Sequence, residues 1–371
     1  MKKHLYYFLI LFLLFFSCKD VGKSDFQEIV VDMDSDISLS LSAIADEITA
    51  IELELTDESL INPDQIYGIL LFENQLFLTQ PTKILVFGMD GKYIRSIGSI
   101  GQGPGEFRSI GKCAIDEKNK RLIVTDMSST NIICYDLNGN FLFQSSAIRE
   151  SGKIMFDLNC INDNIFVLVD EFRLFDAKGT LSQPQIYRLN HDFQITDSMA
   201  IRKANYESLM FYMLMASREL IVSTQAGPCI FCPDYFGQKL MLSETAMQDT
   251  LYRIEKNNLV PELKLKFRND GISGGEKIIE LANVYRSARY VFSFYRNQAK
   301  SSFFNYCYDT KTGTGYNMKD GYTDDIHHIE KRLNIHPLIT DTEFFYYWYT
   351  HLDPDSLEEP NPTLYIGKLK K

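Results

Sequence analysis

The sequence is poor in the short motifs that identify common enzymes. It contains no H-E-x-x-H zinc motif and no phosphate-binding loop. The stretch Gly271-Ile272-Ser273-Gly274-Gly275 has the spacing of a nucleophile elbow, but no strand-to-helix pattern surrounds it, so we interpret it as a flexible loop. These absences leave the sequence without a predicted catalytic residue, metal or cofactor.

Positive charge is also scarce. Lys and Arg number 38 against 49 Asp and Glu, which gives a formal net charge of −11. Nucleic acids and anionic lipid surfaces both attract clustered Lys and Arg. The composition therefore argues against a nucleic-acid partner and against electrostatic binding to a membrane surface.

The apolar run at the N-terminus is too short to span a membrane. Leu5 to Phe16 is twelve residues, whereas a membrane-spanning helix needs about twenty. Lys2 and Lys3 precede the run and Ser17 follows it, so residues 1–17 are predicted to be a cleaved export signal. Its removal takes away two Lys and changes the net charge to −13 (36 − 49).

The end of this signal, Ser17-Cys18, resembles the lipobox of bacterial lipoproteins. Phe15 departs from that motif, which usually has an aliphatic residue there. The resemblance implies that Cys18 becomes the lipidated first residue of the mature chain, with the outer membrane as the expected site in the cell envelope. The alternative is an ordinary signal peptide with an incidental cysteine. Residues 18–40 are polar and are expected to be a tether, and residues 41–371 to be the folded domain.

The cysteines beyond Cys18 are mostly isolated. Cys229-Ile230-Phe231-Cys232 is the one close pair, and Pro228 and Pro233 beside it indicate a loop. A C-x-x-C can be a redox or metal half-site, but no second pair accompanies it, so a loop disulfide or plain packing is favoured. The others lie singly in apolar strand-like runs, where a reduced thiol packs as a small core residue: Cys113, Cys134, Cys160 and Cys307.

One pattern occurs twice between residues 84 and 139. An alternating apolar run ends at Asp90-Gly91 and returns 48 positions later at Asn138-Gly139, and another alternating run follows each. Asp-Gly and Asn-Gly favour tight hairpins, because both central residues need positive φ. The glycine-rich stretch Gly98–Phe107 between the copies is suited to carry the chain from one sheet to the next.

The hairpin pattern recurs along the chain at about 40 to 50 residues, the spacing of one four-stranded blade. The sequence therefore predicts an all-β fold, a six-bladed β-propeller of four-stranded antiparallel blades. The last blade is one strand short, and we expect Thr49–Leu55 to pair with Thr363–Leu369 and close the ring, since an unpaired edge costs stability. Blade four is predicted at Leu209–Met215, Leu220–Thr224, Thr250–Glu255 and Glu262–Phe267, and blade five with only Ser287–Phe294, Phe303–Asp309 and Gly315–Met318.

The order of segments in the second blade resembles an NHL-type propeller repeat: Gly101–Phe107, Cys113–Asp116, Leu122–Asp126 and Ile132–Gly139. Together with the export signal, the chain looks like the six-bladed β-propeller lipoproteins of Gram-negative bacteria. The resemblance is specific over residues 60–145 and implies the fold and export, since most members have no assigned activity.

The turns of this repeat have expected structural roles. Gly101, Gly103 and Gly105 supply backbone freedom, and Pro104 stiffens the crossing between blades. Asp126 is expected to accept hydrogen bonds from nearby amides, the alternative being a ligand at the mouth of the ring.

Two groups of residues are candidates for binding. Arg286 and Arg289 stand with Tyr285 and Tyr290 near an expected inner strand of blade five. They are candidates to line the channel and hold an anionic ligand, the alternative being structural packing. The densest set of metal-ligand types is Asp324-Asp325-Ile326-His327-His328, but adjacent side chains on a strand point opposite ways, which favours a solvated loop.

Two function classes follow. The first is a lipid-anchored binding module for a protein, peptide or glycan. The second is a hydrolase or lyase with a metal in the central channel, which requires acidic, amide or His side chains from several inner strands. The side chains near such positions are Asp64, Asp157, Glu207 and His336. Because no catalytic motif accompanies them, the binding module is preferred.

Overall fold

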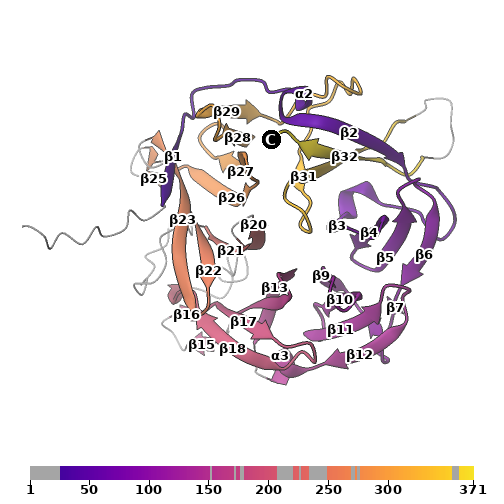
Figure 1. The fold of residues 1–371 in the computed structure, drawn as a ribbon. Coiled ribbons are helices and arrows are strands. Elements are labelled where there is room, and N and C mark those ends of the chain that lie inside the picture. The colour runs from indigo at the N-terminus through magenta and orange to yellow at the C-terminus, as the bar shows by residue number, and fades with distance from the viewer. Residues whose placement is uncertain are drawn as a thin grey trace, which may run out of the picture.

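The protein is a ring of six β-sheets around a central axis (Figure 1). The computed structural model describes residues 26–150, 153–170, 173–175, 179–206, 220–224, 227–233, 249–268, 272–273, 276–352 and 359–371. The predicted six-bladed β-propeller is confirmed. No helix in these ranges is long and apolar enough to cross a membrane.

The first three blades each have four antiparallel strands, with the first strand at the channel and the fourth at the rim (Figure 1). Blade one is β3 (Gly68–Phe72), β4 (Gln75–Gln80), β5 (Lys83–Gly88) and β6 (Tyr93–Ile97). Blade two is β9 (Ile110–Asp116), β10 (Arg121–Asp126), β11 (Asn131–Asp136) and β12 (Phe141–Ser145). Blade three is β13 (Ile154–Ile161), β14 (Asn164–Asp170), β17 (Gln185–Leu189) and β18 (Ile195–Ala200).

The other three blades follow the same plan with additions. Blade four is β20 (Leu220–Thr224), β21 (Gly227–Cys232), β22 (Thr250–Glu255) and β23 (Asn258–Phe267), extended by β1 (Gln27–Val31). Blade five is β26 (Ile279–Arg286), β27 (Tyr290–Asn297), β28 (Ser302–Asp309) and β29 (Thr314–Lys319). Blade six is β30 (His336–Pro337), β31 (Phe344–Tyr349), β32 (Thr363–Leu369) and β2 (Ala45–Glu52).

Short elements connect the blades. The helical ones are α2 (Leu41–Ile44), α3 (Ala147–Glu150) and the 3-10 turn η1 (Pro63–Gln65). The strand pairs are β7 (Ser99–Ile100) with β8 (Glu106–Phe107), and β24 (Ile272–Ser273) with β25 (Glu276–Lys277). A small sheet is inserted in blade three, made of β15 (Arg173–Phe175), β16 (Gly179–Ser182) and β19 (Ala204–Tyr206).

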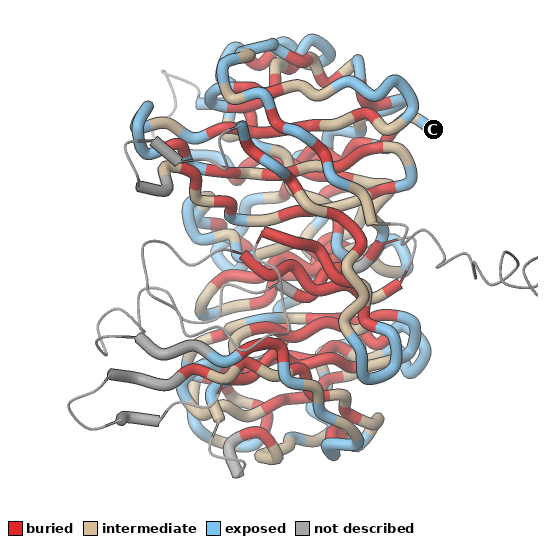
Figure 2. The backbone as a smooth tube through the Cα atoms, turned by 90° about the vertical axis from the view of Figure 1, so that its left-hand side faces the viewer, coloured by how far each residue is buried: buried red, intermediate tan, exposed pale blue. Residues whose placement is uncertain are grey.

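The hydrophobic core is divided into six clusters, one between each pair of neighbouring blades. Each sheet has two faces, and alternate side chains of its strands enter the clusters on either side. Figure 2 shows buried residues along the strands and exposed residues at the turns. Because every blade is covered on both faces, the ring depends on all six contacts.

The ring is closed by the N-terminal segment, as predicted. β2 pairs with β32 as the outermost strand of blade six, with Ile51 opposite Leu364. The paired strand is Ala45–Glu52, four residues earlier at its start than the predicted Thr49–Leu55, because the register extends to Ala45 opposite Leu369. Ile51 is buried between blades six and one.

A second strand of the N-terminal segment was not predicted. β1 lies parallel to β23, and Ile29 and Val31 are buried in the cluster between blades four and five. Residues 27–31 fall inside the stretch 18–40 that was expected to be a tether, so the folded part starts earlier than residue 41. Between β1 and β2 the chain crosses blade five, where the Ile37 N–H donates to the Asn317 carbonyl at 3.0 Å. We call residues 27–52 the N-terminal clasp, because they contact blades four, five and six in turn.

Two blade predictions were wrong in part. In blade four, residues 227–232 form β21 and are not a loop, while the predicted strand Leu209–Met215 lies outside the described residues. Cys229 and Cys232 point to opposite faces of β21, into the clusters toward blades five and three, so the pair packs and is not a disulfide. In blade five, the inner strand β26 was missed, because a register shift between Leu281 and Asn283 interrupts its alternation.

Candidate functional site

The carboxyl group of Asp157 contacts the inner strands of blades two and four as well as belonging to that of blade three. Lys112 Nζ on β9 lies 3.6 Å from Asp157 Oδ1 on β13. The Ile221 N–H on β20 donates to Asp157 Oδ2 at 2.8 Å. Burial raises the pKa of Asp157, and the attraction of Lys112 only partly opposes it. Asp157 therefore joins three inner strands through one ion pair and one hydrogen bond.

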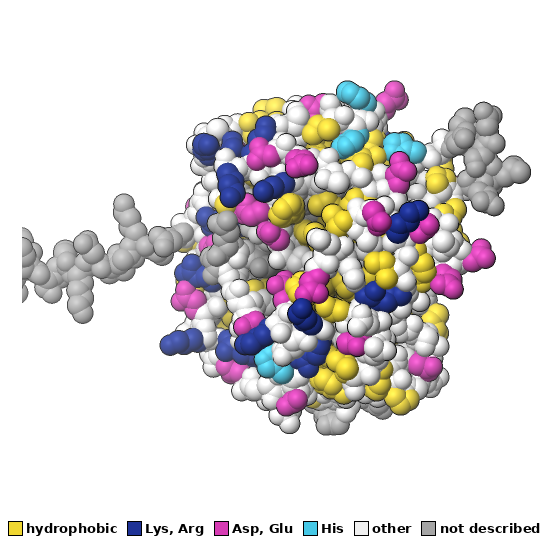
Figure 3. Space-filling view, turned by 45° about the vertical axis from the view of Figure 1, so that its right-hand side comes forward, with side chains coloured by type: hydrophobic (Ala, Val, Ile, Leu, Met, Phe, Trp, Pro, Cys, Tyr) yellow, Lys and Arg dark blue, Asp and Glu magenta, His cyan; other side chains and the backbone are white. Residues whose placement is uncertain are grey.

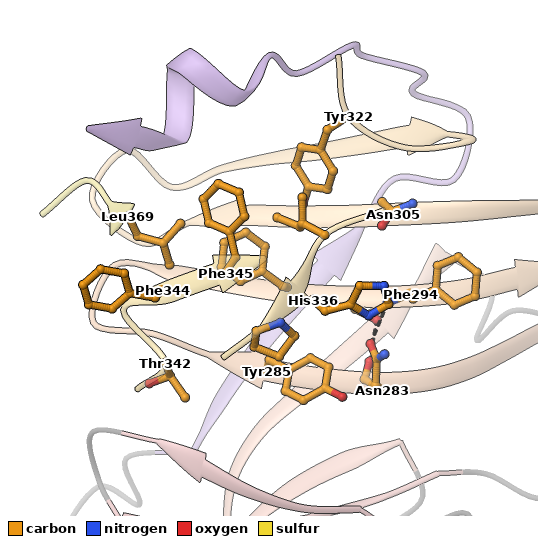
Figure 4. Close-up of a pocket in the computed structure, with 14 residues that line it drawn as sticks. Asn283, Tyr285, Phe294, Asn305, Tyr322, His336, Thr342, Phe344, Phe345 and Leu369 are labelled. Atoms are coloured by element: carbon orange, nitrogen blue, oxygen red, sulfur yellow. Dashed lines mark hydrogen bonds between the residues drawn. The ribbon is translucent and has the colours of Figure 1, made fainter. Parts of the chain in front are cut away.

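A small pocket lies where the inner strands of blades five and six meet (Figure 4). Its polar groups include Asn283, Tyr285, Thr342 and His336. The Asn283 side-chain oxygen accepts a hydrogen bond from the Phe294 N–H at 2.8 Å. The cavity volume is about 40 Å³, which is space for a few water molecules and not for a drug-sized ligand.

His336 lines this pocket with an uncharged imidazole. Burial lowers the pKa of His336 to about 4, so the imidazole is uncharged at neutral pH. Its ring stacks with those of Tyr346 and Trp348, at centroid distances of 5.4 and 5.2 Å. Burial also raises the pKa of Tyr285 well above its usual range. The pocket therefore offers neutral hydrogen-bonding groups and no formal charge.

The four residues considered for anion binding do not converge on one point. Arg289 forms two hydrogen bonds to Asp309, at 3.0 and 2.7 Å, and its guanidinium lies over the Tyr290 ring. Arg286 pairs with Glu262 of blade four at 2.8 Å. Tyr290 is buried and Tyr285 lines the small pocket. Both arginine charges are thus already matched by carboxylates.

The residues considered for a metal are spread over the ring. Asp157 and His336 are on inner strands, Asp64 is exposed in η1, and Glu207 lies outside the described residues. In the ranges that the structure describes, no group of three or more His, Cys, Asp or Glu side chains is placed to hold a metal ion.

The His-containing segment is a loop at blade six. His327 Nδ1 lies 3.7 Å from the buried Asp324 Oδ2, and His328 adopts a positive φ of 58°. Asp324 also accepts hydrogen bonds from the backbone N–H groups of Ile326 and His327. The glycine-rich 271–275 stretch is described only at Ile272–Ser273, in β24.

The predicted turn residues occupy tight positions between blades one and two. Gly105 has a φ of +75°, and a Cβ there would lie 2.7 Å from the Phe141 ring. The Gly105 carbonyl accepts a hydrogen bond from the Tyr135 hydroxyl at 2.7 Å. Asp126 accepts hydrogen bonds from the Ser109 and Ser128 N–H groups and from the Ser129 hydroxyl. These contacts are within the protein and hold the turns in place.

The two ends of the ring differ in their connections. Strands one and two of a blade, and strands three and four, are joined by short turns, such as Glu73-Asn74 and Asn162-Asp163 with positive φ. We call that end the short-turn surface. The connections from strand two to three and from one blade to the next lie at the other end, include the longest ones, and form the long-loop surface.

Exposed apolar side chains concentrate on the long-loop surface. Five of them, between 40% and 65% exposed, extend from blade six to blade three: Leu352, Leu60, Tyr67, Met127 and Ile154. Among the described residues, the large apolar side chains exposed at or just after the short turns are each less than half exposed: Ile94, Phe141, Leu142, Ile195 and Ile339. On the face drawn in Figure 3, acidic and basic side chains are interspersed. The long-loop surface thus has apolar side chains that are more than half exposed, namely Leu60, Tyr67, Met127 and Leu352.

Two features of the inner ring had no signal in the sequence. Lys112 was not considered, because its role depends on Asp157 from another blade. The loop between β30 and β31 projects into the middle of the ring (Figure 1), and Ile339 and Thr340 on it reach residues of blades two and three. Alternating patterns predict strands, and they do not show which loops meet across a channel.

Comparisons with known proteins give one matching family and a solved structure of similar fold. A family model described as "Domain of unknown function (DUF4934)" matches residues 26–370. A crystal structure of a "putative exported protein" from Bacteroides fragilis is similar, with a TM-score of 0.61, 16% identity, and coverage of 93% of this chain and 100% of that one. A member of the DUF4221 family from Bacteroides vulgatus has a TM-score of 0.44 and 11% identity, covering 88% of this chain and 97% of that one. No curated protein sequence matches the chain.

Proposed function

This chain belongs to the DUF4934 family, and we propose that it is an exported, lipid-anchored binding module that contacts a protein partner through its long-loop surface. The observation that carries the proposal is that the long-loop surface has apolar side chains more than half exposed, whereas those beside the short turns are less than half exposed. Exposed apolar groups on loops held by a rigid scaffold are typical of contact surfaces.

The channel supports binding in preference to chemistry. Asp157 is engaged by Lys112 and the Ile221 N–H, and His336 is a neutral imidazole packed against the rings of Tyr346 and Trp348. Arg286 and Arg289, the cations of blade five considered for an anionic ligand, are paired with carboxylates. These groups hold the blades together, which leaves the loops as the part of the molecule free to meet a partner.

Export and anchoring are supported by the signal layout. Lys2 and Lys3, the apolar run and Ser17-Cys18 have the order of a lipoprotein signal. A multiply acylated cysteine holds a protein stably on a membrane, whereas one chain does not. Metabolic labelling with a clickable fatty acid tests this step: the native protein should carry the label, and Cys18→Ala should lose both label and membrane association. Label retained in Cys18→Ala contradicts the anchor.

Site-specific photo-crosslinking tests the contact surface. A photoreactive amino acid at Met127 or Leu352, on the long-loop surface, should give a covalent adduct with a partner protein in intact cells. The same group at Asp90 or Lys311, on the short-turn surface, is the matched control and should give none. Adducts from the control positions alone, or from no position, contradict the proposed contact.

A further inference from the structure

A second cavity lies on the short-turn side of the channel. It has a volume of about 490 Å³ and is lined by the first turns of blades two and three and by the β30–β31 loop of blade six. This volume is within the range of small-molecule sites, about 300 to 1,000 Å³. Blade three stands opposite blade six in a ring of six, so the loop closes the cavity from across the channel (Figure 1).

Most of the charge around the cavity is already balanced. Asp116 pairs with Arg121 at 2.7 Å and accepts hydrogen bonds from Asn119. Burial by itself raises the pKa of Asp116, but these hydrogen bonds outweigh it and the pKa is lowered, so the carboxylate stays ionised beside its arginine. Asp163 pairs with Lys118 at 3.1 Å across the two turns. The cavity is therefore polar, and the charge left over in its lining is that of one carboxylate, Glu117.

Three polar side chains in the lining are unused. Within the described part of the chain, the Glu117 carboxylate, the Asn162 amide and the Thr340 hydroxyl form no hydrogen bond with the protein. They come from blades two, three and six respectively, and so surround the space from three sides. Ile339 on the loop adds an exposed apolar side chain to the same lining.

We infer that this cavity binds a small neutral sugar. A sugar presents several hydroxyl groups, which donate to a carboxylate and both donate to and accept from an amide and a hydroxyl. Its C–H face is apolar and fits against Ile339. A peptide chain needs a groove open at both ends, and the β30–β31 loop closes this cavity on the side of blade six. The site is separate from the long-loop surface and does not depend on the proposed protein contact.

Saturation-transfer NMR with the purified full-length protein, in a detergent without a sugar headgroup, tests the inference. The probes are glucose, galactose and N-acetylglucosamine, with spermidine as the cationic comparison. At least one sugar should receive saturation and spermidine should not. The double variant Glu117→Gln/Thr340→Val should weaken sugar binding by about tenfold or more. A sugar hydroxyl that loses its hydrogen-bond partner in the site lowers the binding affinity strongly.

Matched variants separate this loss from unfolding. Glu28→Gln/Thr314→Val changes the same residue types on β1 and β29, away from the cavity, and should bind like the native protein. Thr340→Ser keeps the hydroxyl and should also retain binding. No saturation of any of the three sugars overturns the inference. Binding of spermidine that is lost in Glu117→Gln, without sugar binding, also overturns it and makes the cavity a cation site.

Discussion

The guanidinium of Arg289 and the carboxylate of Asp309 form a bidentate ion pair, with Nε to Oδ1 at 3.0 Å and Nη2 to Oδ2 at 2.7 Å. Arg289 also donates to the Lys371 carbonyl at the C-terminus, at 3.1 Å. The pair thus links two turns of blade five to the last residue of blade six. An arginine that was considered for ligand binding is instead part of a contact between blades.

Arg289→Ala should lower the free energy of unfolding by about 2 kcal/mol, because the largely buried Asp309 loses two charge-assisted hydrogen bonds. Arg108→Ala is the control, since Arg108 is exposed, and should change stability by less than about 0.5 kcal/mol. Urea denaturation measures both. Equal stability of the two variants would show that the Arg289 pair contributes little.

This contribution should depend on pH. The hydrogen bonds from Arg289 hold the pKa of Asp309 below its usual value, which is about 3.9 in an unfolded chain. A lowered folded-state pKa means that the stabilisation is complete above about pH 4 and is lost as the pH falls through the folded-state pKa. The stability difference between native protein and Arg289→Ala should therefore shrink in acid, and a constant difference from pH 7 to pH 3 contradicts the assignment.

β1 offers a comparison between adjacent residues of the same type. Val31 is 0% exposed and Val30 is 66% exposed. Val31→Ala should lower the free energy of unfolding by about 2 kcal/mol, since it removes buried methyl groups from the cluster between blades four and five. Val30→Ala should cost less than about 0.5 kcal/mol. If both variants melt at the native temperature, residues 27–31 are a tether after all.

Closure of the ring can be tested on β2. Ile51→Ala should cost about 3 kcal/mol, because Ile51 is buried where blade six meets blade one. Thr49→Ala, on the same strand with an exposed side chain, should have little effect. Hydrogen exchange measured alongside should show faster exchange at Thr363–Leu369 in Ile51→Ala alone, since this strand pairs with β2. Unchanged exchange at Thr363–Leu369 argues that β2 is dispensable.

The glycines before blade two should not tolerate substitution equally. Gly105→Ala should cost about 2 kcal/mol or more, because φ is positive there and the new Cβ would overlap the Phe141 ring. At Gly103 a Cβ would approach only the flexible end of Glu106, at 3.1 Å, so Gly103→Ala should cost less than about 1 kcal/mol. Thermal melting measures the stability of the two variants. A smaller loss of stability for Gly105→Ala than for Gly103→Ala would contradict this account of the turn.

The regular blades were predictable and the irregular ones were not. In blades one and two the strands are short apolar runs separated by turn residues such as Asp90-Gly91 and Asn138-Gly139, so local pattern and tertiary structure agree. In blade four, Pro228 and Pro233 indicated a loop, yet Pro228 lies near the start of β21 opposite Ser223. β1 was missed because it has only five residues, beside an Asp-rich stretch, which are too few to show a clear alternation of apolar and polar side chains.

The site was less predictable than the fold, for a physical reason. Asp157 and His336 were correctly placed near inner strands, but what they do depends on Lys112, Ile221, Tyr346 and Trp348 from other strands. Likewise Glu117, Asn162 and Thr340 meet only because turns far apart in sequence come together at one end of the channel. Such convergence is a property of the closed ring, and it leaves no signal in the local sequence.

The pairing of β2 with β32 also sets an order of events during synthesis. β2 is near the start of the chain and its partner ends at Leu369, two residues before the last. Because the N-terminus is made first, residues 45–52 must wait as an unpaired, partly apolar strand until β32 has been made. Blades one to three can form meanwhile, but the ring cannot close. The period of greatest exposure to proteases and to aggregation therefore lasts until residues 363–369 are available for pairing.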